Sequence, residues 1–353
     1  DKQICLVGSE MCIRDRVMAG GSGERFWPVS TPENPKQFLK LSDPNRSLLQ
    51  QSIDRASQQF GGSNTFIATA SRFVDKTREH CPSVPRENVI GEPCKRNTTG
   101  ALVWACANLM ARDPQAWELV TMAVLTADHN IQPAEAFSQT TNRAMTLAEE
   151  LEAYVTIGIT PDRPATEFGY IERGGGTDVE RFTEKPDAET AKEFLESGNY
   201  FWNSGMFFWT LKSFVKGLEE HGIVSQARLA VLTSALATGD HDGAAAAFET
   251  LESVSIDYAL MEKASNVHVV PAEFDWDDLG SWDALERSLP KDDDGNVVVG
   301  PARLVDCHNC IVYNETIDEV SAVGLNDCVV VKRGVETMVC PKSEAQRVRE
   351  LAR

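Results

Sequence analysis

The sequence predicts an α/β protein in which a mixed, mostly parallel β-sheet is flanked by helices and followed by a small C-terminal domain of short strands. Two observations predict this class. Apolar runs typical of strands buried on both faces, such as residues 119–125 and 154–159, alternate with amphipathic helical stretches. Short β-prone runs separated by turn residues then recur between residues 297 and 339, which is the pattern of a β-solenoid-like unit.

The predicted elements divide the chain into three parts. Residues 1–16 form an anomalous start that need not be native sequence, because the charged residues Arg14 to Arg16 stand where a buried strand should end. Residues 17–290 form the α/β domain. After a charged break, residues 291–353 form the β-rich domain, in which the pattern predicts a final helix from Ser343 to Ala352.

Composition narrows the classes of function. The chain has 353 residues, of which 53 are acidic and 34 are basic, and the net charge of -19 argues against nucleic-acid or anionic-membrane binding. No apolar run approaches the length of a membrane span. The nine cysteines are scattered without regular spacing, which predicts reduced thiols and a cytoplasmic location. An acidic protein that binds phosphates needs local positive potential from clustered cations, backbone N–H groups and a divalent metal.

A glycine-rich segment near the N-terminus is the first candidate site. Glycines let backbone N–H groups approach an anion closely, and two cations follow them, which together suit a nucleoside triphosphate. The alternative is an ordinary glycine turn between a strand and a helix, because the spacing matches neither the P-loop nor the dinucleotide fingerprint. The residues concerned are Ala19, Gly20, Gly21, Ser22, Gly23, Arg25 and Lys36.

The segment from Glu92 to Thr99 is a candidate for base recognition. Glu92, Arg96 and Asn97 would supply acceptors and donors to a purine edge, and guanine would need both. Asn97 and Thr98 are also good N-caps for a helix from Thr99 to Arg112, so helix capping explains them equally well.

Acidic residues after two predicted strands are candidates for metal binding. Asp128 follows the apolar run 119–125, at the edge where open α/β sheets place ligands. Asp277 and Asp278 belong to an acidic cluster between tryptophans, and carboxylate oxygens are the ligands that hard cations prefer. Either of these two acids would complete a site with Asp128. Helix capping or an acidic turn remains the alternative for all three.

Two further polar residues stand out from their surroundings. Lys185 lies at the end of a predicted strand, directly before Pro186, a position that can aim the ammonium into a cleft. Asn203 is the one amide in the aromatic stretch from Tyr200 to Trp209. A buried amide is costly unless its donors and acceptors are matched, and a pair of sugar hydroxyls would match them.

Taken together, these motifs resemble the sugar-nucleotide pyrophosphorylases, and most closely the bacterial mannose-1-phosphate guanylyltransferases. The resemblance implies a Rossmann-like nucleotidyltransferase domain followed by a left-handed β-helix-like domain. The departures from the family pattern are the first 16 residues and Thr126, where a proline commonly stands. The matching motifs run in order from Val17 to about Lys342: AGGSGERFWPVS, PKQF, EPCKRNT, LTADH, GITPDRPATEFGYI, FTEKPD, WNSGMFFW, SIDYALMEK, WDDLGSW and VGLNDCVVV.

The resemblance also implies a reaction. GTP and mannose 1-phosphate would give GDP-mannose and pyrophosphate, by in-line attack of the sugar phosphate on the α-phosphate of GTP in the presence of Mg²⁺. The alternatives are a pyrophosphorylase for another nucleotide or hexose 1-phosphate, and a catalytically silent nucleotide-sugar sensor. Analogy with the family suggests a homodimer, although the sequence does not fix the oligomeric state.

The roles that the resemblance assigns fall into four groups. Among the adjacent acids, Asp278 is preferred over Asp277 because the family's ligand stands two residues before the glycine. The implied assignments are Arg25, Lys36 and Lys185 as catalytic residues; Ala19 to Gly23 with Glu92, Arg96 and Asn97 as the nucleotide site; Gly169, Tyr170, Glu184 and Asn203 as the sugar site; and Asp128 with Asp278 as the Mg²⁺ ligands.

Overall fold

The structure is a computed structural model that describes residues 24–352 and the backbone of residues 12–19. Contacts group this part of the chain into two compact units. The sheet unit comprises residues 12–19, 53–126 and 132–274, and the solenoid unit comprises residues 24–52, 127–131 and 275–352. The units are therefore not consecutive in the sequence, because the segments that follow two strands of the sheet pack with the C-terminal part of the chain.

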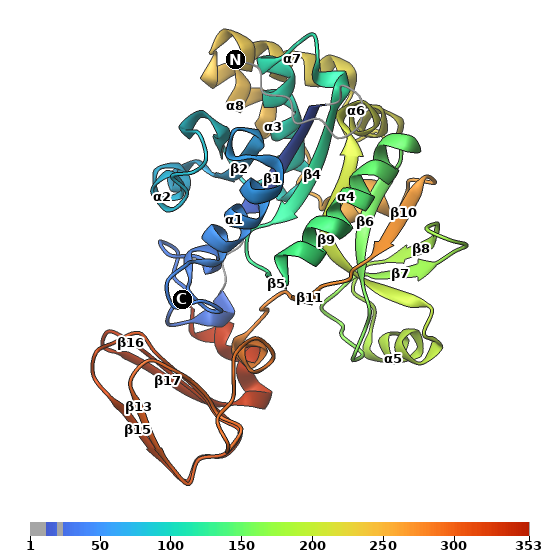
Figure 1. The fold of residues 1–353 in the computed structure, drawn as a ribbon. Helices are drawn as coiled ribbons and strands as arrows, with labels where there is room; N and C mark the ends of the chain where they lie inside the picture. The colour runs from blue at the N-terminus through green and yellow to red at the C-terminus, as the bar shows by residue number, and fades with distance from the viewer. Residues whose placement is uncertain (1–11, 20–23, 353) are drawn as a thin grey trace. The chain divides into compact units, whose positions relative to one another are not determined.

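The sheet unit is built on a nine-stranded mixed sheet (Figure 1). Seven strands run in the order β10-β6-β9-β4-β1-β2-β3, and β7 pairs with β8 and β9. Strand β9 is antiparallel to β4 and β6, whereas the other pairs of the seven are parallel, which confirms the predicted sheet. The strands are β1 Cys12–Ala19, β2 Thr65–Ala70, β3 Val89–Glu92, β4 Val120–Thr126, β6 Tyr154–Ile159, β7 Tyr170–Arg173, β8 Val179–Thr183, β9 Tyr200–Thr210 and β10 Val267–Pro271.

Strand β1 runs through the charged residues of the anomalous N-terminal segment. Its backbone pairs in parallel with both β2 and β4, and Arg14 lies in register with Met122 and Arg16 with Val124. The charges from Arg14 to Arg16 therefore do not interrupt the strand, since the ladder is formed by backbone groups. The predicted phosphate loop from Gly20 to Gly23 lies outside the described residues.

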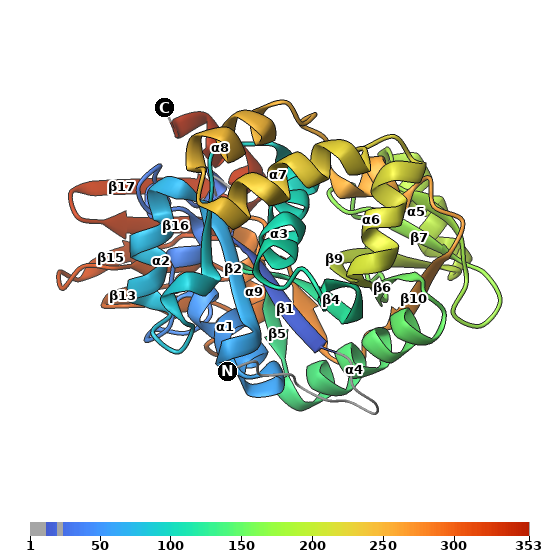
Figure 2. The ribbon, with the colours of Figure 1, turned by 90° about the horizontal axis from the view of Figure 1, so that it is seen from above.

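Helices cover both faces of the sheet (Figure 2). Helices α3, α6, α7 and α8 lie over one face, and α4 with the last turns of α1 lies over the other. Large apolar side chains such as Trp209 and Phe214 are fully buried between these layers. The helices are α1 Leu48–Phe60, α2 Val74–His80, α3 Asn97–Arg112, α4 Ala134–Glu150, α5 Ala188–Ser197, α6 Leu211–Glu220, α7 Gln226–Thr238, α8 His241–Glu249 and α9 Leu285–Ser288, with a π-helix at Asp257–Met261.

Capping signals fix the ends of α5 as the sequence predicts. The Asp187 side chain accepts a hydrogen bond from the Thr190 N–H at 2.8 Å, and Gly198 ends the helix in the left-handed region with φ 65°. A helix follows the C-terminal strands as predicted, and Lys342–Leu351 is a 3₁₀ helix. Its buried residues, Ala345 and Val348, are three apart, and this spacing places both on one face of a 3₁₀ helix.

The solenoid unit contains stacked parallel strands, as predicted. A four-stranded sheet has the order β12-β14-β16-β17, in which only β17 is antiparallel, and β13 pairs in parallel with β15. Side chains from one face of the larger sheet, including Ile311 and Val329, pack with Trp282 and Leu285 in a common core. The strands are β12 Val297–Val299, β13 Ala302–Val305, β14 Ile311–Asn314, β15 Val320–Val323, β16 Cys328–Arg333 and β17 Glu336–Pro341, and β11 Asp275–Asp277 pairs with β5 Asn130–Gln132.

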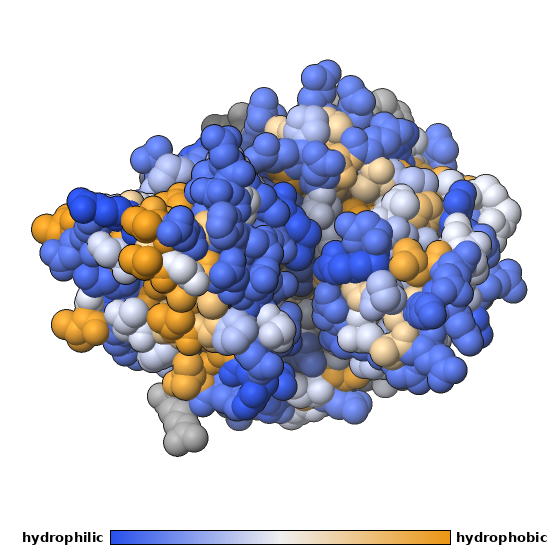
Figure 3. Space-filling view, turned by 90° about the horizontal axis from the view of Figure 1, so that it is seen from below, coloured by the Kyte–Doolittle hydropathy of each residue, from blue (hydrophilic) through white to orange (hydrophobic). Residues whose placement is uncertain are grey.

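Apolar side chains also gather on the surface of the C-terminal strands (Figure 3). Val305 and Val323 lie in register on β13 and β15 and are 46% and 70% exposed, while Ile317 and Val335 are almost fully exposed. Exposed apolar patches of this kind mark interaction surfaces in many proteins. The homodimer suggested by the family stays a prediction. Among the described residues, no helix has the length and apolarity needed to cross a membrane.

Candidate functional site

In the solenoid unit, Lys36 brings the two predicted metal ligands together. Lys36 begins the 3₁₀ helix Lys36–Phe38, and its side chain is only 11% exposed. The Nζ atom donates to Oδ2 of Asp128 at 2.9 Å and to the backbone carbonyl of Asp278 at 2.5 Å. Three residues that lie far apart in the sequence thus form one charged group, which we call the acid–lysine centre.

The surroundings of Asp128 keep its carboxylate ionised. Burial raises the pKa of Asp128, but Lys36 and then His129 lower it by more, so the pKa lies below its usual value. The Nδ1 atom of His129 is 3.0 Å from the indole nitrogen of Trp276, and its Nε2 is 3.9 Å from Oδ1 of Asp128. His129 directly follows Asp128 in the LTADH motif but was not among the residues predicted from the sequence.

The two adjacent acids of the WDDLG motif have different partners. Oδ1 of Asp277 accepts from the Leu279 N–H at 2.7 Å, and Oδ2 pairs with Nε of Arg287 at 2.5 Å. Asp277 therefore holds the turn, in which Leu279 has φ 46°. A Cβ atom on Gly280 would lie 3.1 Å from the Asp278 carboxylate, so the glycine keeps space beside that acid. The assignment of Asp278 rather than Asp277 as the metal ligand stays a prediction.

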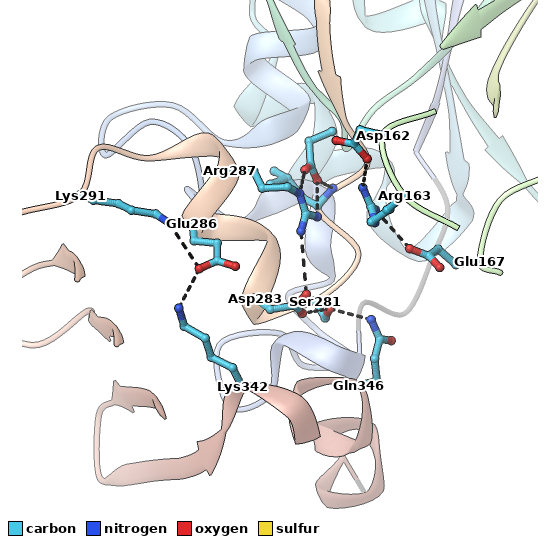
Figure 4. A network of polar contacts seen from close by, with 12 residues as sticks. Asp162, Arg163, Glu167, Ser281, Asp283, Glu286, Arg287, Lys291, Lys342 and Gln346 are labelled. Atoms are coloured by element: carbon cyan, nitrogen blue, oxygen red, sulfur yellow. Dashed lines mark hydrogen bonds and ion pairs between the residues drawn. The ribbon is translucent and has the colours of Figure 1, made fainter. Parts of the chain in front are cut away.

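A polar network fixes the segment that follows this turn (Figure 4). Glu286 accepts from Nζ of Lys342 at 2.7 Å and pairs with Lys291 at 3.5 Å. Gln346 donates to the Ser281 hydroxyl at 2.8 Å. The C-terminal 3₁₀ helix is thereby bonded to the segment that follows Asp278 in the chain, which ties the β-rich tail to this part of the solenoid unit.

The donor set of the acid–lysine centre fits Mg²⁺. This ion is usually bound through one or two carboxylates together with substrate phosphates and water. Asp128 and Asp278 would supply the two carboxylates. No cluster of three or more side chains suited to a metal ion occurs among the described residues, so the remaining ligands would have to come from substrate and solvent.

In the sheet unit, four of the predicted sugar-site and catalytic residues come together. Nζ of Lys185 lies 2.9 Å from Oε1 of Glu184, and the Asn203 N–H donates to the carbonyl of Gly169 at 2.8 Å. A Cβ atom on Gly169 would lie 2.6 Å from Oε2 of Glu184, so only glycine leaves room for that carboxylate. Lys185 has φ 46°, a strained backbone of the kind that clusters at functional sites.

The amide of Asn203 differs from the sequence expectation. Its Nδ2 donates to Oδ1 of Asp257 at 2.9 Å, and its Oδ1 accepts from the Thr156 hydroxyl at 3.0 Å and the Gly205 N–H at 3.2 Å. The protein itself therefore provides most of the partners that sugar hydroxyls were expected to provide. Asp257 was missed, although it stands in the SIDYALMEK motif.

Tyr170 occupies a different environment from the other predicted sugar ligands. Its side chain is fully buried and packs against the rings of Phe194 and Tyr200. A buried ring has no access to a sugar, so a contact from Tyr170 would have to come from its backbone.

The base-recognition candidates lie at the start of α3. Arg96 donates to the backbone carbonyl of Glu249, from Nη2 at 2.6 Å and from Nε at 3.2 Å, and so caps the end of α8. Asn97 has φ 57°, and its Oδ1 accepts from the Thr98 N–H at 2.8 Å. Glu92 ends β3. A role for these residues in reading a base stays a prediction, and so does the role of Arg25, which lies half-exposed on the 3₁₀ helix Glu24–Phe26.

Comparisons with known proteins identify similar chains. Residues 16–294 match the family model described as nucleotidyl transferase, and residues 296–353 match that of the MannoseP isomerase/GMP-like beta-helix domain. Alginate biosynthesis protein AlgA of Pseudomonas aeruginosa is 36% identical over 96% of this chain and 71% of its own length. A mannose-1-phosphate guanylyltransferase of Sinorhizobium fredii is 37% identical over 90% of this chain, which spans 64% of that relative.

A solved structure extends the likeness to the fold. The crystal structure described as mannose-1-phosphate geranyltransferase from Thermus thermophilus has a TM-score of 0.84 and 33% identity. The alignment covers 96% of this chain and 98% of that chain.

Proposed function

The chain belongs to the nucleotidyl transferase family, and from this premise we propose that it transfers GMP from GTP to mannose 1-phosphate, giving GDP-mannose and pyrophosphate. The observation that carries the proposal is the acid–lysine centre, in which Lys36 bonds to both Asp128 and Asp278. The choice of substrates is supported by the names of the relatives, several of which are mannose-1-phosphate guanylyltransferases.

The reaction needs no protein nucleophile. A phosphate oxygen of mannose 1-phosphate forms a bond to the α-phosphorus of GTP, and the bond from that phosphorus to the bridging oxygen of pyrophosphate breaks. The protein has to bring two anions together and stabilise the charge on the phosphate oxygens, which is achieved by positioning and electrostatics. Arg25, Lys36 and the glycine-rich loop would supply the positive potential on the triphosphate.

Asp128 and Asp278 would hold Mg²⁺, since both are presented to one lysine and the donor set fits this ion. The ion would supply positive charge that offsets the repulsion between the two anionic substrates. Lys36, which bonds to both acids in the present structure, would remain close to the phosphates and add its own charge.

The polar group around Lys185 would bind the sugar 1-phosphate. The ammonium of Lys185 suits the phosphate, and the carboxylate of Glu184, whose side chain is only 10% exposed, suits sugar hydroxyl donors. The remaining N–H of Asn203 and the backbone at Gly169 would add further contacts. Glu92, Arg96 and Asn97 are proposed to select guanine, and the cytoplasmic location also stays a prediction.

A pyrophosphate-release assay tests the proposal. The protein is supplied with mannose 1-phosphate and Mg²⁺ while GTP, ATP, UTP and dTTP compete, and we expect GTP to be consumed preferentially. The exposed Asp242→Asn variant serves as a control for Asp128→Asn, which should lose release. Preference for a pyrimidine nucleotide would contradict the assignment, and binding of GDP-mannose without any pyrophosphate release would support the sensor alternative.

A further inference from the structure

We propose that Asp257 is a positioning residue for the sugar 1-phosphate, because it orients Asn203 and acts with Glu184 as a counter-charge to Lys185. This inference rests on the proposed function and extends it to a residue to which no role has been assigned.

Asp257 begins a π-helix that runs to Met261. The Glu262 N–H donates to the Asp257 carbonyl at 2.9 Å, an i to i+5 bond, so the two residues lie one above the other on the same side of the helix. In an α-helix, residues five apart would point about 140° away from each other. The π-turn therefore presents two carboxylates on the same side, and π-turns of this kind frequently occur at functional sites.

The carboxylate of Glu262 faces the strand end that carries Glu184 and Lys185. Oε1 of Glu262 accepts from the Glu184 N–H at 3.3 Å, and this bond holds the backbone of the strand end. Asp257 contacts strand β9, which β7 separates from β8, and its Oδ1 accepts there from Nδ2 of Asn203 at 2.9 Å. The π-turn thus links two segments of the proposed sugar site to one rigid support.

The support is itself anchored at its start. The Ile256 N–H donates to the Thr98 hydroxyl of α3 at 2.8 Å, and Ile256 is almost fully buried. These contacts of Ile256 fix the backbone position of Asp257, and its carboxylate is placed by a short side chain on that fixed backbone. An anchored acid can fix the rotamer of the amide to which it is bonded.

The charges around Asp257 identify its second effect. Burial lowers the pKa of Lys185, but Glu184 and then Asp257 raise it by more, so the ammonium stays charged. Glu184, Tyr258 and Glu262 are the other titratable groups close to this lysine and to Asp257. Because the Lys185 side chain is 61% exposed, two carboxylates beside it limit the directions in which it can point.

An ionised carboxylate at Asp257 lowers the stability of the fold. Burial, together with the charge of Glu184, raises the pKa of Asp257 to about 6. A group whose charged form is disfavoured by its surroundings adds nothing to stability by being ionised, and groups perturbed in this way cluster at functional sites. A purely structural hydrogen bond to Asn203 would be made equally well by an asparagine at this position.

Steady-state kinetics of Asp257→Ala and Asp257→Asn test the inference, with the exposed Asp242→Asn as the matched control. We expect Asp257→Ala to raise KM for mannose 1-phosphate by about tenfold or more, and KM for GTP by less than about threefold. Asp257→Asn keeps an acceptor for Asn203 but not the charge, so it should restore part of the loss. Asp242→Asn should match the parent protein.

The outcomes separate this inference from the proposed function. If the parent protein releases pyrophosphate and Asp257→Ala leaves KM for mannose 1-phosphate unchanged, the inference is wrong and the function stands. Equal rises in both KM values, with a lower melting temperature in both variants, would show a structural role and also overturn it. If the parent protein neither turns over nor binds mannose 1-phosphate by calorimetry, the proposed function fails, and the inference fails with it.

Discussion

Replacing Lys36 by methionine removes the ammonium that holds the acid–lysine centre together. The substitution keeps an unbranched side chain that is one atom shorter, and it removes two hydrogen bonds, one to Asp128 and one to the carbonyl of Asp278. A hydrogen bond to a charged group contributes about 1.5–3 kcal/mol to the free energy of unfolding. An exposed ion pair contributes at most about 1 kcal/mol, whereas breaking a buried ion pair costs about 3–5 kcal/mol. With side chains 11% and 27% exposed, this pair lies between those limits, and we expect Lys36→Met to lower the free energy of unfolding by about 2–3 kcal/mol.

Denaturant unfolding of a double-mutant cycle measures this contribution. The cycle combines Lys36→Met with Asp128→Asn, and we expect a coupling energy of about 1–2 kcal/mol, because each single change removes the same ion pair. Lys40→Met is the matched control, since Lys40 is exposed and lies four residues away. Mg²⁺ should stabilise Lys36→Met more than the parent protein, because the Asp128 carboxylate then lacks the ammonium with which it is paired.

Additive effects of the two changes would refute the reasoning. The same conclusion would follow if Lys36→Met cost no more stability than Lys40→Met, or if Mg²⁺ stabilised both proteins equally.

Three further predictions concern the two proposed substrate sites. Arg25→Ala should lower turnover by about two to three orders of magnitude in the pyrophosphate-release assay, as expected for loss of a charge contact in the transition state, and full activity would remove Arg25 from the catalytic residues. Gly169→Ala should raise KM for mannose 1-phosphate, because the added Cβ would lie 2.6 Å from Oε2 of Glu184 and displace it; an unchanged KM would argue against a role for Glu184. Asp257→Asn should raise the free energy of unfolding at pH 8 by at most about 3 kcal/mol. The reason is that the pKa of Asp257 is about 6 in the folded protein, above its ordinary value of 3.8, so the ionised carboxylate destabilises the fold. That penalty is fully present above pH 6 and disappears as the pH falls towards 4, so an equal gain by denaturant unfolding at pH 8 and pH 4 would contradict it.

Local patterns in the sequence were sufficient for most of the fold. The apolar run that ends before Asp128 became the buried strand β4, and Asp187 and Gly198 delimit α5 as capping rules require. Strand β1 was harder to predict, because the charges at Arg14 to Arg16 are atypical of a strand that pairs on both sides. The short strand β13 was missed, since its alternating half-buried side chains give a weak apolar signal.

The candidate site was harder to predict from the sequence, because its contacts join residues that are distant in the sequence. The sequence left capping and metal binding open for Asp128, and it gave no sign of the 2.9 Å contact with Lys36, which lies 92 residues away. The family pattern selected Asp278, but the partner of Asp277 was not predicted, since Arg287 lies ten residues further along the chain. Asp257 was overlooked because a π-turn has no recognised sequence signal, and without it the acid does not face Asn203.

The central claim is that Asp128 and Asp278, held by Lys36, form the metal and phosphate centre of a guanylyl transfer reaction. Mg²⁺-dependent pyrophosphate release from GTP and mannose 1-phosphate tests it most directly when Asp278→Asn is compared with its neighbour Asp277→Asn. We predict that Asp278→Asn lowers turnover by about two to three orders of magnitude and requires more Mg²⁺, whereas Asp277→Asn mainly lowers stability by breaking its pair with Arg287. Full activity of Asp278→Asn at the Mg²⁺ concentration of the parent protein would contradict the claim.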